Sequence, residues 1–217
     1  RDRIMRLKRM CPGQDVAYYL PTYGLVEDIA YKRFPAMFDR LDIPYTLNKQ
    51  SARIKTEIGD IIFRTMDNPA RIVGFEVAHS ICDELDTLPI NKARDVWNKV
   101  IARNRQKAFT ESGISVKNTV AVATTPEGFR FVWERWVKNK APGYELHRAR
   151  TMDNVNNLPD GYIDNLTNSY PSSLLSAYLD GEFVNLTAGS VYPEFDRKLN
   201  ASSEVVMPGD ALHIGMD

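Results

Sequence analysis

Two adjacent acids, Asp83 and Glu84, end a short apolar run in the stretch "HSICDELDTLP". The run is typical of a buried strand, and ligands of open α/β sheets gather where such strands end. A carboxylate there suits Mg²⁺ on a nucleotide, and a second group can orient an attacking water. Successive side chains of a strand point to opposite sides, so neighbouring acids can divide these tasks. The pattern predicts that Asp83 holds the metal and that Glu84 polarises the water.

A purely structural interpretation of the same acids stays open. Residues 83–86 would then cap a helix that begins near Pro89, because aspartate is a favoured helix N-cap. An apolar run that ends in Asp-Glu is common, so this stretch alone does not separate capping from nucleotide chemistry.

Two hydroxyl side chains follow another apolar run, in "AVATTPEG", where Thr124 and Thr125 precede Pro126. Hydroxyls at a second strand end could sense the γ-phosphate of a nucleotide and transmit its loss to the segment that follows. The alternative is an ordinary strand end whose threonines cap the next helix.

The elements that would position these residues alternate between strands and helices. Helical periodicity covers 1–10, 25–41 with an interruption at Pro35, 89–109 and 128–139, whereas 15–21, 76–84, 118–126 and 144–152 are typical of strands. Residues 52–66 predict a hairpin that turns at Gly59-Asp60. This alternation indicates an α/β fold with a mainly parallel, doubly wound sheet.

The chain becomes polar and rich in turn residues from about residue 151. We expect a short helix over 171–183 that closes at Asp180-Gly181, and irregular connections over 190–197 and 202–210. The last segment, 211–217, predicts a strand that ends at Asp217. This part is interpreted as a lid or linker that leads into a second domain.

Composition sets wide bounds on function. The 217 residues are 43% hydrophobic and 26% charged, which is ordinary for a soluble globular protein. The 28 basic residues balance the 28 acidic ones, so net charge argues neither for nor against nucleic acid. Two cysteines are too few for a disulfide framework, and no apolar run approaches the ~18 residues of a membrane span.

Several segments together resemble the large terminase subunit of tailed bacteriophages, the ATPase motor that packages viral DNA. In chain order they are "IVGFEVAHSICDELDTL", "VAVATTPEGF", "RTMDN", "YLDGEFVNLTAGSVYPEFD" and "LHIGMD". The resemblance covers nearly the whole chain. It implies an additional-strand, RecA-like P-loop ATPase core over 1–150, a linker or lid subdomain over 151–208, and the first strand of an RNase H-like nuclease over 209–217.

The resemblance also implies roles for individual residues. Asp83 and Glu84 match the family's Walker B pair, which implies ATP and Mg²⁺ as cofactors. Thr124 and Thr125, with the proline after them, match the coupling motif beside the nucleotide. Asp217 matches the first metal-binding aspartate of the nuclease, which uses Mg²⁺ or Mn²⁺. The implied partners are double-stranded DNA, the portal protein, a small terminase subunit and sibling copies in a ring on the procapsid, all in the host cytoplasm.

The glycine-rich loop that cradles phosphates in P-loop proteins is missing. No G-x-x-x-x-G-K-[ST] occurs in these residues, so backbone cradle and lysine are both absent from them. We interpret this as truncation and expect the 217 residues alone neither to hydrolyse ATP nor to cut DNA. Two alternatives stay open: another RecA-like translocase or helicase, and a non-catalytic assembly module with a degenerate P-loop fold.

One arginine, Arg71, lies shortly before the acidic pair. Similar arginines in some large terminases reach into a neighbouring subunit's active site, and such a finger is worth about 10³-fold or more in rate. The alternative is an ion pair with a nearby acid such as Asp67. Arg64 is the second choice because it belongs to the hairpin.

Other charged and aromatic residues have simpler interpretations. Basic residues along the helix after the acidic pair could contact DNA, but a solvated helix face is the default: Arg94, Lys99, Arg103, Arg105 and Lys107. Trp97, Trp133 and Trp136 have helical spacing and are expected in the core. The histidines and cysteines form no metal-ligand spacing.

Overall fold

The structure is a computed structural model in which residues 1–184 are described. The predicted strand over 211–217 with Asp217, and the irregular connections over 190–197 and 202–210, lie outside the described residues. The part of the chain that is described contains no helix that is long and apolar enough to cross a membrane.

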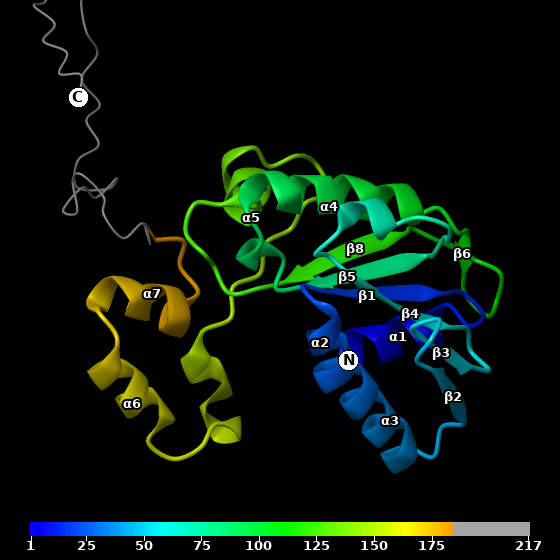
Figure 1. Cartoon of the computed structure of the whole chain (residues 1–217), viewed down its shortest axis with the longest axis horizontal. Coiled ribbons are helices and arrows are strands. Elements are labelled where there is room, and N and C mark those ends of the chain that lie inside the picture. The colour runs from blue at the N-terminus through cyan, green and yellow to red at the C-terminus, as the bar shows by residue number, and fades with distance from the viewer. Residues whose placement is uncertain (185–217) are drawn as a thin grey trace, which may run out of the picture. The chain divides into compact units, whose positions relative to one another are not determined.

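A six-stranded sheet in the order β2-β3-β4-β1-β5-β8 forms the centre of the fold (Figure 1). Its strands are β1 (Val16–Leu20), β2 (Tyr45–Asn48), β3 (Arg53–Thr56), β4 (Ile61–Thr65), β5 (His79–Asp83) and β8 (Thr119–Ala123). The pairs β1–β4, β1–β5 and β5–β8 are parallel, and the pairs that involve β3 are antiparallel. The predicted α/β fold with a mainly parallel sheet is therefore confirmed.

Helices cover both faces of this sheet. The helices of the described residues are α1 (Asp2–Met10), α2 (Tyr23–Leu25), α3 (Tyr31–Arg40), α4 (Ile90–Arg103), α5 (Phe131–Trp133), α6 (Tyr162–Ser169) and α7 (Ser172–Asp180). A short π-helical turn, Val26–Ala30, precedes α3, and another, Glu134–Lys138, follows α5. Three 3-10 turns of the described residues span Pro69–Arg71, Leu85–Thr87 and Thr151–Asn157.

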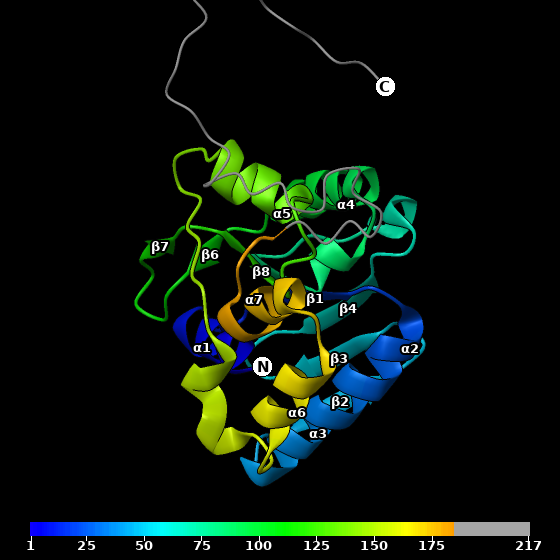
Figure 2. The ribbon, with the colours of Figure 1, turned by 90° about the vertical axis from the view of Figure 1, so that its left-hand side faces the viewer.

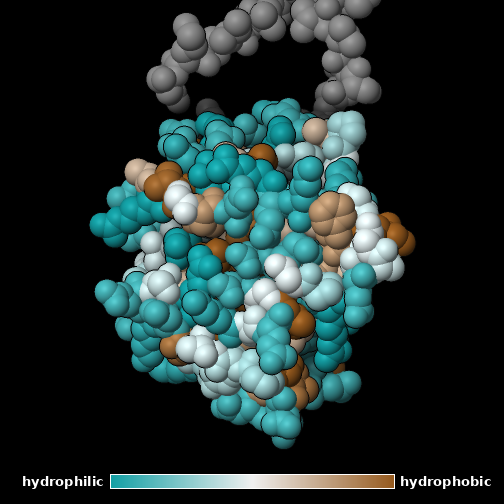
Figure 3. All heavy atoms as spheres, turned by 90° about the vertical axis from the view of Figure 1, so that its right-hand side faces the viewer, coloured by the Kyte–Doolittle hydropathy of each residue, from teal (hydrophilic) through white to brown (hydrophobic). Residues whose placement is uncertain are grey.

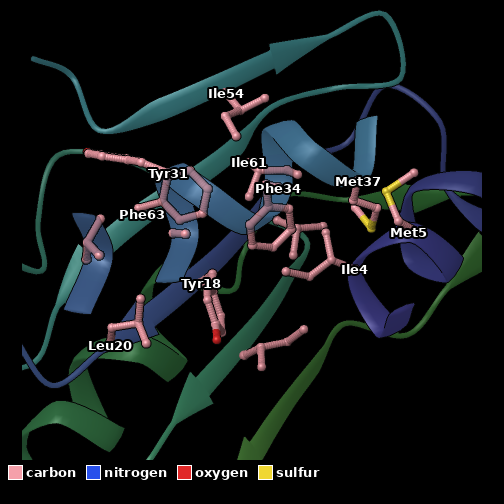
Figure 4. Close-up of a cluster of buried hydrophobic side chains, with 14 of the residues drawn as sticks. Ile4, Met5, Tyr18, Leu20, Tyr31, Phe34, Met37, Ile54, Ile61 and Phe63 are labelled. Carbon is pink, nitrogen blue, oxygen red and sulfur yellow. The ribbon is translucent and has the colours of Figure 1, made fainter. Parts of the chain in front are cut away.

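The central strand β1 shows how the two faces are packed. All five of its residues are buried, as expected of a parallel strand covered on both sides. Val16, Tyr18 and Leu20 join one apolar cluster with α1 and α3 (Figure 4). Ala17 and Tyr19 join a second cluster with α4 and α5 on the opposite face. Period-2 alternation along one strand thus connects both halves of the core.

The strand predicted over 144–152 is wrong. No strand hydrogen bonds form there, and a 3-10 turn begins at Thr151. Tyr144 and Leu146 nevertheless pack against the second apolar cluster, which accounts for the alternating sequence pattern. A strand requires a paired neighbour as well as an apolar pattern, and this segment has none among the described residues.

The helix predicted over 89–109 ends early, at Arg103. The side-chain amide of Asn104, which follows it, donates hydrogen bonds to the carbonyls of Ala78 (3.2 Å) and Thr119 (2.9 Å). These bonds tie the chain to β5 and β8 and turn it away from the helix axis. Residues predicted as its last turn instead form β6 (Ala108–Phe109), which pairs with β7 (Ser115–Val116).

Several other boundaries depended on tertiary context. The predicted hairpin is β3–β4, but β2 adds a third antiparallel strand that the sequence reading missed. The helix predicted over 25–41 is not interrupted at Pro35, which lies inside α3. It is interrupted upstream, by the π-helical turn Val26–Ala30. The polar segment after residue 151 contains α6, which was not predicted. The predicted stop at Gly181 is confirmed, because that residue has left-handed geometry with φ of 64°.

Figure 3 shows the face that lies on the right of Figure 1, and hydrophilic residues dominate it. Apolar residues appear there as small separate groups. Single exposed apolar side chains are normal on a protein surface, so this face provides no argument for a docking site.

Candidate functional site

The acidic pair lies at the carboxyl end of β5, between β1 and β8 in the sheet. Asp83 is the last residue of the strand and is in register with Ala123, the last residue of β8. Thr124 and Thr125 follow Ala123 directly. The structure therefore brings four predicted site residues to one edge of the sheet, where the carboxyl ends of parallel strands meet (Figure 1).

Asp83 is held by a neighbouring strand. Its Oδ2 accepts a short hydrogen bond from the hydroxyl of Tyr18 on β1. Asp83 makes no ion pair in the described part of the chain. Its other carboxylate oxygen accepts no hydrogen bond from residues 1–184, so water or a ligand can bind it.

Glu84 adopts a backbone conformation that non-glycine residues rarely use. Its φ of 53° and ψ of 42° are left-handed, and such geometry costs on the order of 1 kcal/mol, which the surrounding contacts must offset. The amide of Glu84 donates to the carbonyl of Ala123 over 2.7 Å. This turn ends β5 and directs the Glu84 side chain toward the end of β8.

The carboxylate of Glu84 contacts both predicted threonines. Its Oε2 accepts hydrogen bonds from the Thr124 hydroxyl (3.3 Å) and from the Thr125 amide (3.4 Å). Burial raises the pKa of Glu84, the Thr125 and Thr124 hydrogen bonds oppose that rise, and the nearby charge of Asp83 adds to it. A carboxylate with a raised pKa beside a second acid is typical of groups that take part in proton transfer.

A third acid, Asp86, ties the two strand ends together. It is fully buried, its Oδ1 accepts from the amide of Val132 (3.0 Å), and its own amide donates to the Thr124 hydroxyl (3.4 Å). Arg130 donates to its carbonyl over 3.2 Å. Asp86 therefore caps the first turn of α5. The capping interpretation that the sequence left open, a cap on the helix after Pro89, is wrong, since the carboxylates of residues 83–86 bind Tyr18, Thr124, Thr125 and Val132 and not α4 within residues 1–184.

A groove of about 1230 Å³ opens beside these residues, and we call it the strand-end groove. One wall is the segment 118–126, which contains β8, and the other is the segment 143–149. The groove is also lined by Tyr18, Asp83, Ala177 and Tyr178. Figures 1 and 2 show α7, which carries the last two, beyond the carboxyl ends of the parallel strands. Thr151 donates to the carbonyl of Tyr178 over 2.6 Å, which fixes α7 to the chain that leaves the core.

Arg71 is not part of this groove. It is exposed, at the end of the 3-10 turn Pro69–Arg71, and lines a separate hollow of about 240 Å³ with Arg64. The proposed pairing with Asp67 does not form within residues 1–184, where Asp67 accepts from Thr65 and from the Asn68 amide. Arg64 is occupied, since its guanidinium lies 4.9 Å from the Phe75 ring centroid.

The remaining candidates from the sequence divide between core and surface. Trp97 and Trp136 are buried with ring centroids 4.9 Å apart, as expected of core residues, whereas Trp133 is only partly buried. Of the basic residues along α4 and beyond, Arg94 pairs with Glu134 and Arg105 with Glu76. DNA contact by this face stays a prediction.

The donor set suits one kind of metal site. Residues 1–184 contain no cluster of three or more His, Cys, Asp or Glu that could hold an ion alone. Mg²⁺ is commonly bound by one or two carboxylates together with water and substrate phosphates. A single strand-end aspartate with one free oxygen beside a groove fits such a shared site, in which a nucleotide completes the coordination.

Sequence reasoning missed the contributions of Tyr18 and Asp86. Tyr18 belongs to an apolar run that predicts only a buried strand, because its role depends on β1 lying next to β5. The sequence pattern places Asp86 in a helix cap. The sequence does contain one indication of the role of Asp86: this acid lies between two apolar residues, Leu85 and Leu88, and both are buried.

Comparisons with known proteins identify the family and the fold of the chain. The family model for the N-terminal part of the terminase large subunit, T4likevirus type, matches residues 13–199. The large terminase of a thermophilic bacteriophage superposes with a TM-score of 0.69 at 16% identity, over 95% of this chain and 49% of that protein. The same phage protein in complex with ADP gives 0.67 at 17% identity, over 90% and 46%.

A shorter relative gives a more equal overlap. The large terminase ATPase domain of Thermus phage P74-26, in a mutant form, superposes with a TM-score of 0.56 at 16% identity, over 80% of this chain and 78% of that one. At these identities the likeness shows a shared fold. The present chain spans about half the length of the thermophilic phage protein. No match was found among curated proteins.

Proposed function

This chain belongs to the T4-type family of terminase large subunits, and we propose on that basis that it forms most of an ATP-hydrolysing motor core. The motor would translocate double-stranded viral DNA into a procapsid. One observation carries this proposal: the carboxylate of Glu84 meets Thr124 and Thr125 across the ends of two parallel strands, with Asp83 beside it.

The two acids of this site have separate roles in the proposal. Asp83 corresponds to the Walker B aspartate and would hold the Mg²⁺ that accompanies ATP. When bound, that ion neutralises charge that develops on the phosphates. Glu84 would orient and deprotonate the attacking water, a role favoured by its raised pKa and its partial burial.

The contacts around Thr124 offer a route from the nucleotide to the rest of the chain. Thr124 contacts Glu84 with its hydroxyl and receives the amide of Asp86, and Asp86 holds the first turn of α5. A change in the charge next to Glu84 would alter its bond with Thr124 first. The loop between β8 and α5 would then carry that change toward the linker helices over 151–184.

The strand-end groove provides a place for the phosphate-binding loop that these residues lack. Among the described residues β8 is an edge strand, and the other wall of the groove, 143–149, overlaps the predicted strand 144–152, which has no pairing partner there. We place one strand of the longer protein between them, followed by the glycine-rich loop.

The remaining assignments rest on the sequence resemblance. Domain limits at 1–150, 151–208 and 209–217, and a C-terminal endonuclease that uses Asp217 with Mg²⁺ or Mn²⁺, are proposals for the whole protein. So are the portal protein, the small terminase subunit and a homo-oligomeric ring as partners. Arg71 is assigned as a finger that reaches a neighbouring subunit, in keeping with its exposure and its place outside the strand-end groove.

The proposal is tested by packaging in a defined system of procapsids, double-stranded DNA and the longer protein that contains this chain. Asp83→Asn should abolish both ATP hydrolysis and DNA uptake. Asp95→Asn, which changes an exposed acid on α4, is the matched control and should leave both unchanged. Normal ATP hydrolysis and DNA uptake by the Asp83→Asn protein would contradict the role proposed for Asp83.

A further inference from the structure

We propose that Tyr18 is a positioning residue for the metal-binding carboxylate, holding Asp83 so that one oxygen faces the metal of the bound nucleotide. This inference rests on the proposed function of Asp83. It assigns to a tyrosine in the core of the sheet a role that extends beyond packing.

The strand register places the two side chains on one face of the sheet. Tyr18 on β1 is in register with Ile81 on β5, and both belong to the same apolar cluster. Asp83 follows two residues after Ile81, so its side chain points to the same face. The long phenol side chain spans that diagonal and donates to Oδ2 of Asp83.

Aromatic packing fixes the direction of this donor. The Tyr18 ring makes edge-on contacts with Phe34 and Phe63, with centroid distances of 5.9 and 6.3 Å. Only 8% of the residue is exposed, and Figure 4 shows its hydroxyl oxygen pointing away from both phenylalanines. A ring held in this way cannot follow a mobile carboxylate, so the carboxylate takes its orientation from the ring.

The hydroxyl of Tyr18 is the donor in this contact, and it engages Oδ2 of Asp83. Because one carboxylate oxygen is engaged by this donor, the other is left for water or a metal, and the bidentate arrangement is disfavoured.

Binding of Mn²⁺ in the presence of ATPγS, followed by electron paramagnetic resonance of the longer protein, tests the inference. Tyr18→Phe removes only the hydroxyl and should weaken Mn²⁺ binding about 10- to 100-fold, as for other groups that orient a metal ligand. The affinity for metal-free ATPγS should stay unchanged. Tyr19→Phe is the matched control, because Tyr19 is buried on the opposite face of the same strand.

The outcomes separate this inference from the proposed function. If wild-type protein binds Mn²⁺ with ATPγS and Asp83→Asn does not, the site is established. Equal affinities of Tyr18→Phe and Tyr19→Phe would then overturn the role of Tyr18 alone. If the wild-type protein holds no Mn²⁺, or Asp83→Asn binds it normally, both proposals fail.

A second measurement needs no loss of the hydroxyl. With 3-fluorotyrosine at position 18, the ¹⁹F resonance should shift when Mg²⁺ is added with ATPγS, because the charge on the hydrogen-bond acceptor changes. The same label at position 19 should shift much less. A position-18 resonance that does not move on metal binding would overturn the inference even if Tyr18→Phe proved too unstable to study.

Discussion

The carboxylate of Glu84, at the end of β5, accepts a hydrogen bond from the hydroxyl of Thr124, at the end of β8. The two residues are 40 positions apart in the chain and meet because their strands are parallel neighbours in register. An acid with a raised pKa is thereby joined to the first residue of the loop that leads to α5. This contact links the proposed chemistry to the proposed transmission of force.

The hydrogen bond from Thr124 should set part of the acidity of Glu84. Since that bond stabilises the carboxylate, Thr124→Val should raise the pKa of Glu84 above its already raised value. Side-chain ¹³C NMR titration of Glu84 in the 217-residue chain measures this. Thr125→Val is the control, because Thr125 donates through its backbone amide, which valine retains. Identical titrations of the wild-type and Thr124→Val chains would contradict the assignment.

Asp86 should stabilise the start of α5. Asp86→Ala leaves the buried amide of Val132 without its acceptor, and an unsatisfied buried donor costs about 1–3 kcal/mol. The free energy of unfolding, measured by urea denaturation, should fall by that amount. Asp86→Asn retains an acceptor oxygen and should lose less, and Asp95→Ala on the exposed face of α4 should change little. A loss for Asp86→Ala no larger than for Asp95→Ala would show that this cap does not hold α5.

Arg71 should act between subunits of the assembled ring. Arg71→Ala alone should lower ATP hydrolysis about 10³-fold, the usual effect of losing an arginine finger. In a mixed ring, subunits that carry Glu84→Gln retain the arginine and subunits that carry Arg71→Ala retain the acid. Where the two alternate, some sites are complete, so the mixture should recover activity that neither variant has alone. A mixture as inactive as its components would argue against a finger acting between subunits.

Lys8 should make stability depend on pH in the alkaline range. Burial lowers the pKa of Lys8 to about 8, while its ammonium donates to the carbonyls of Gln14 and Ile58. At pH values between this folded-state pKa and the pKa of about 10.4 expected for a lysine in the unfolded chain, the unfolded chain binds more protons than the folded chain. The free energy of unfolding therefore rises with pH over this range.

The effect of Lys8 is isolated by comparison with Lys8→Met. The unfolding free energy of the wild-type chain minus that of Lys8→Met should increase by roughly 2 kcal/mol from pH 7 to pH 10. The control is Lys99→Met, which replaces an exposed lysine of α4. The unfolding free energy of the wild-type chain minus that of Lys99→Met should not change between pH 7 and pH 10. Parallel pH profiles for wild-type and Lys8→Met would show that the Lys8 ammonium is not perturbed in the folded state.

The sequence predicted the elements whose patterns are local. β1 and β5 could be recognised from apolar runs, and the end of α7 from Gly181, because burial and left-handed geometry leave a signature in a few adjacent residues. The position of the acidic pair followed from β5 alone. The place of Thr124 beside it required only that two strands be parallel neighbours.

What the sequence could not predict depended on contacts between distant segments. The end of α4 is set by Asn104, whose amide reaches two strands far away in the chain. Segment 144–152 has a strand pattern without a pairing partner among the described residues. The roles of Tyr18 and Asp86 arise from which strands and helices become neighbours, and no local pattern of residues encodes that.

The most direct test of the central claim is single-turnover hydrolysis of ATP by the longer protein with Glu84→Gln. Glutamine keeps the size of the side chain but cannot accept a proton from water. The rate should fall about 10²–10⁴-fold, the usual contribution of a general base, while ATPγS and Mn²⁺ still bind. Hydrolysis at the wild-type rate by Glu84→Gln would contradict the claim that this acid activates the water.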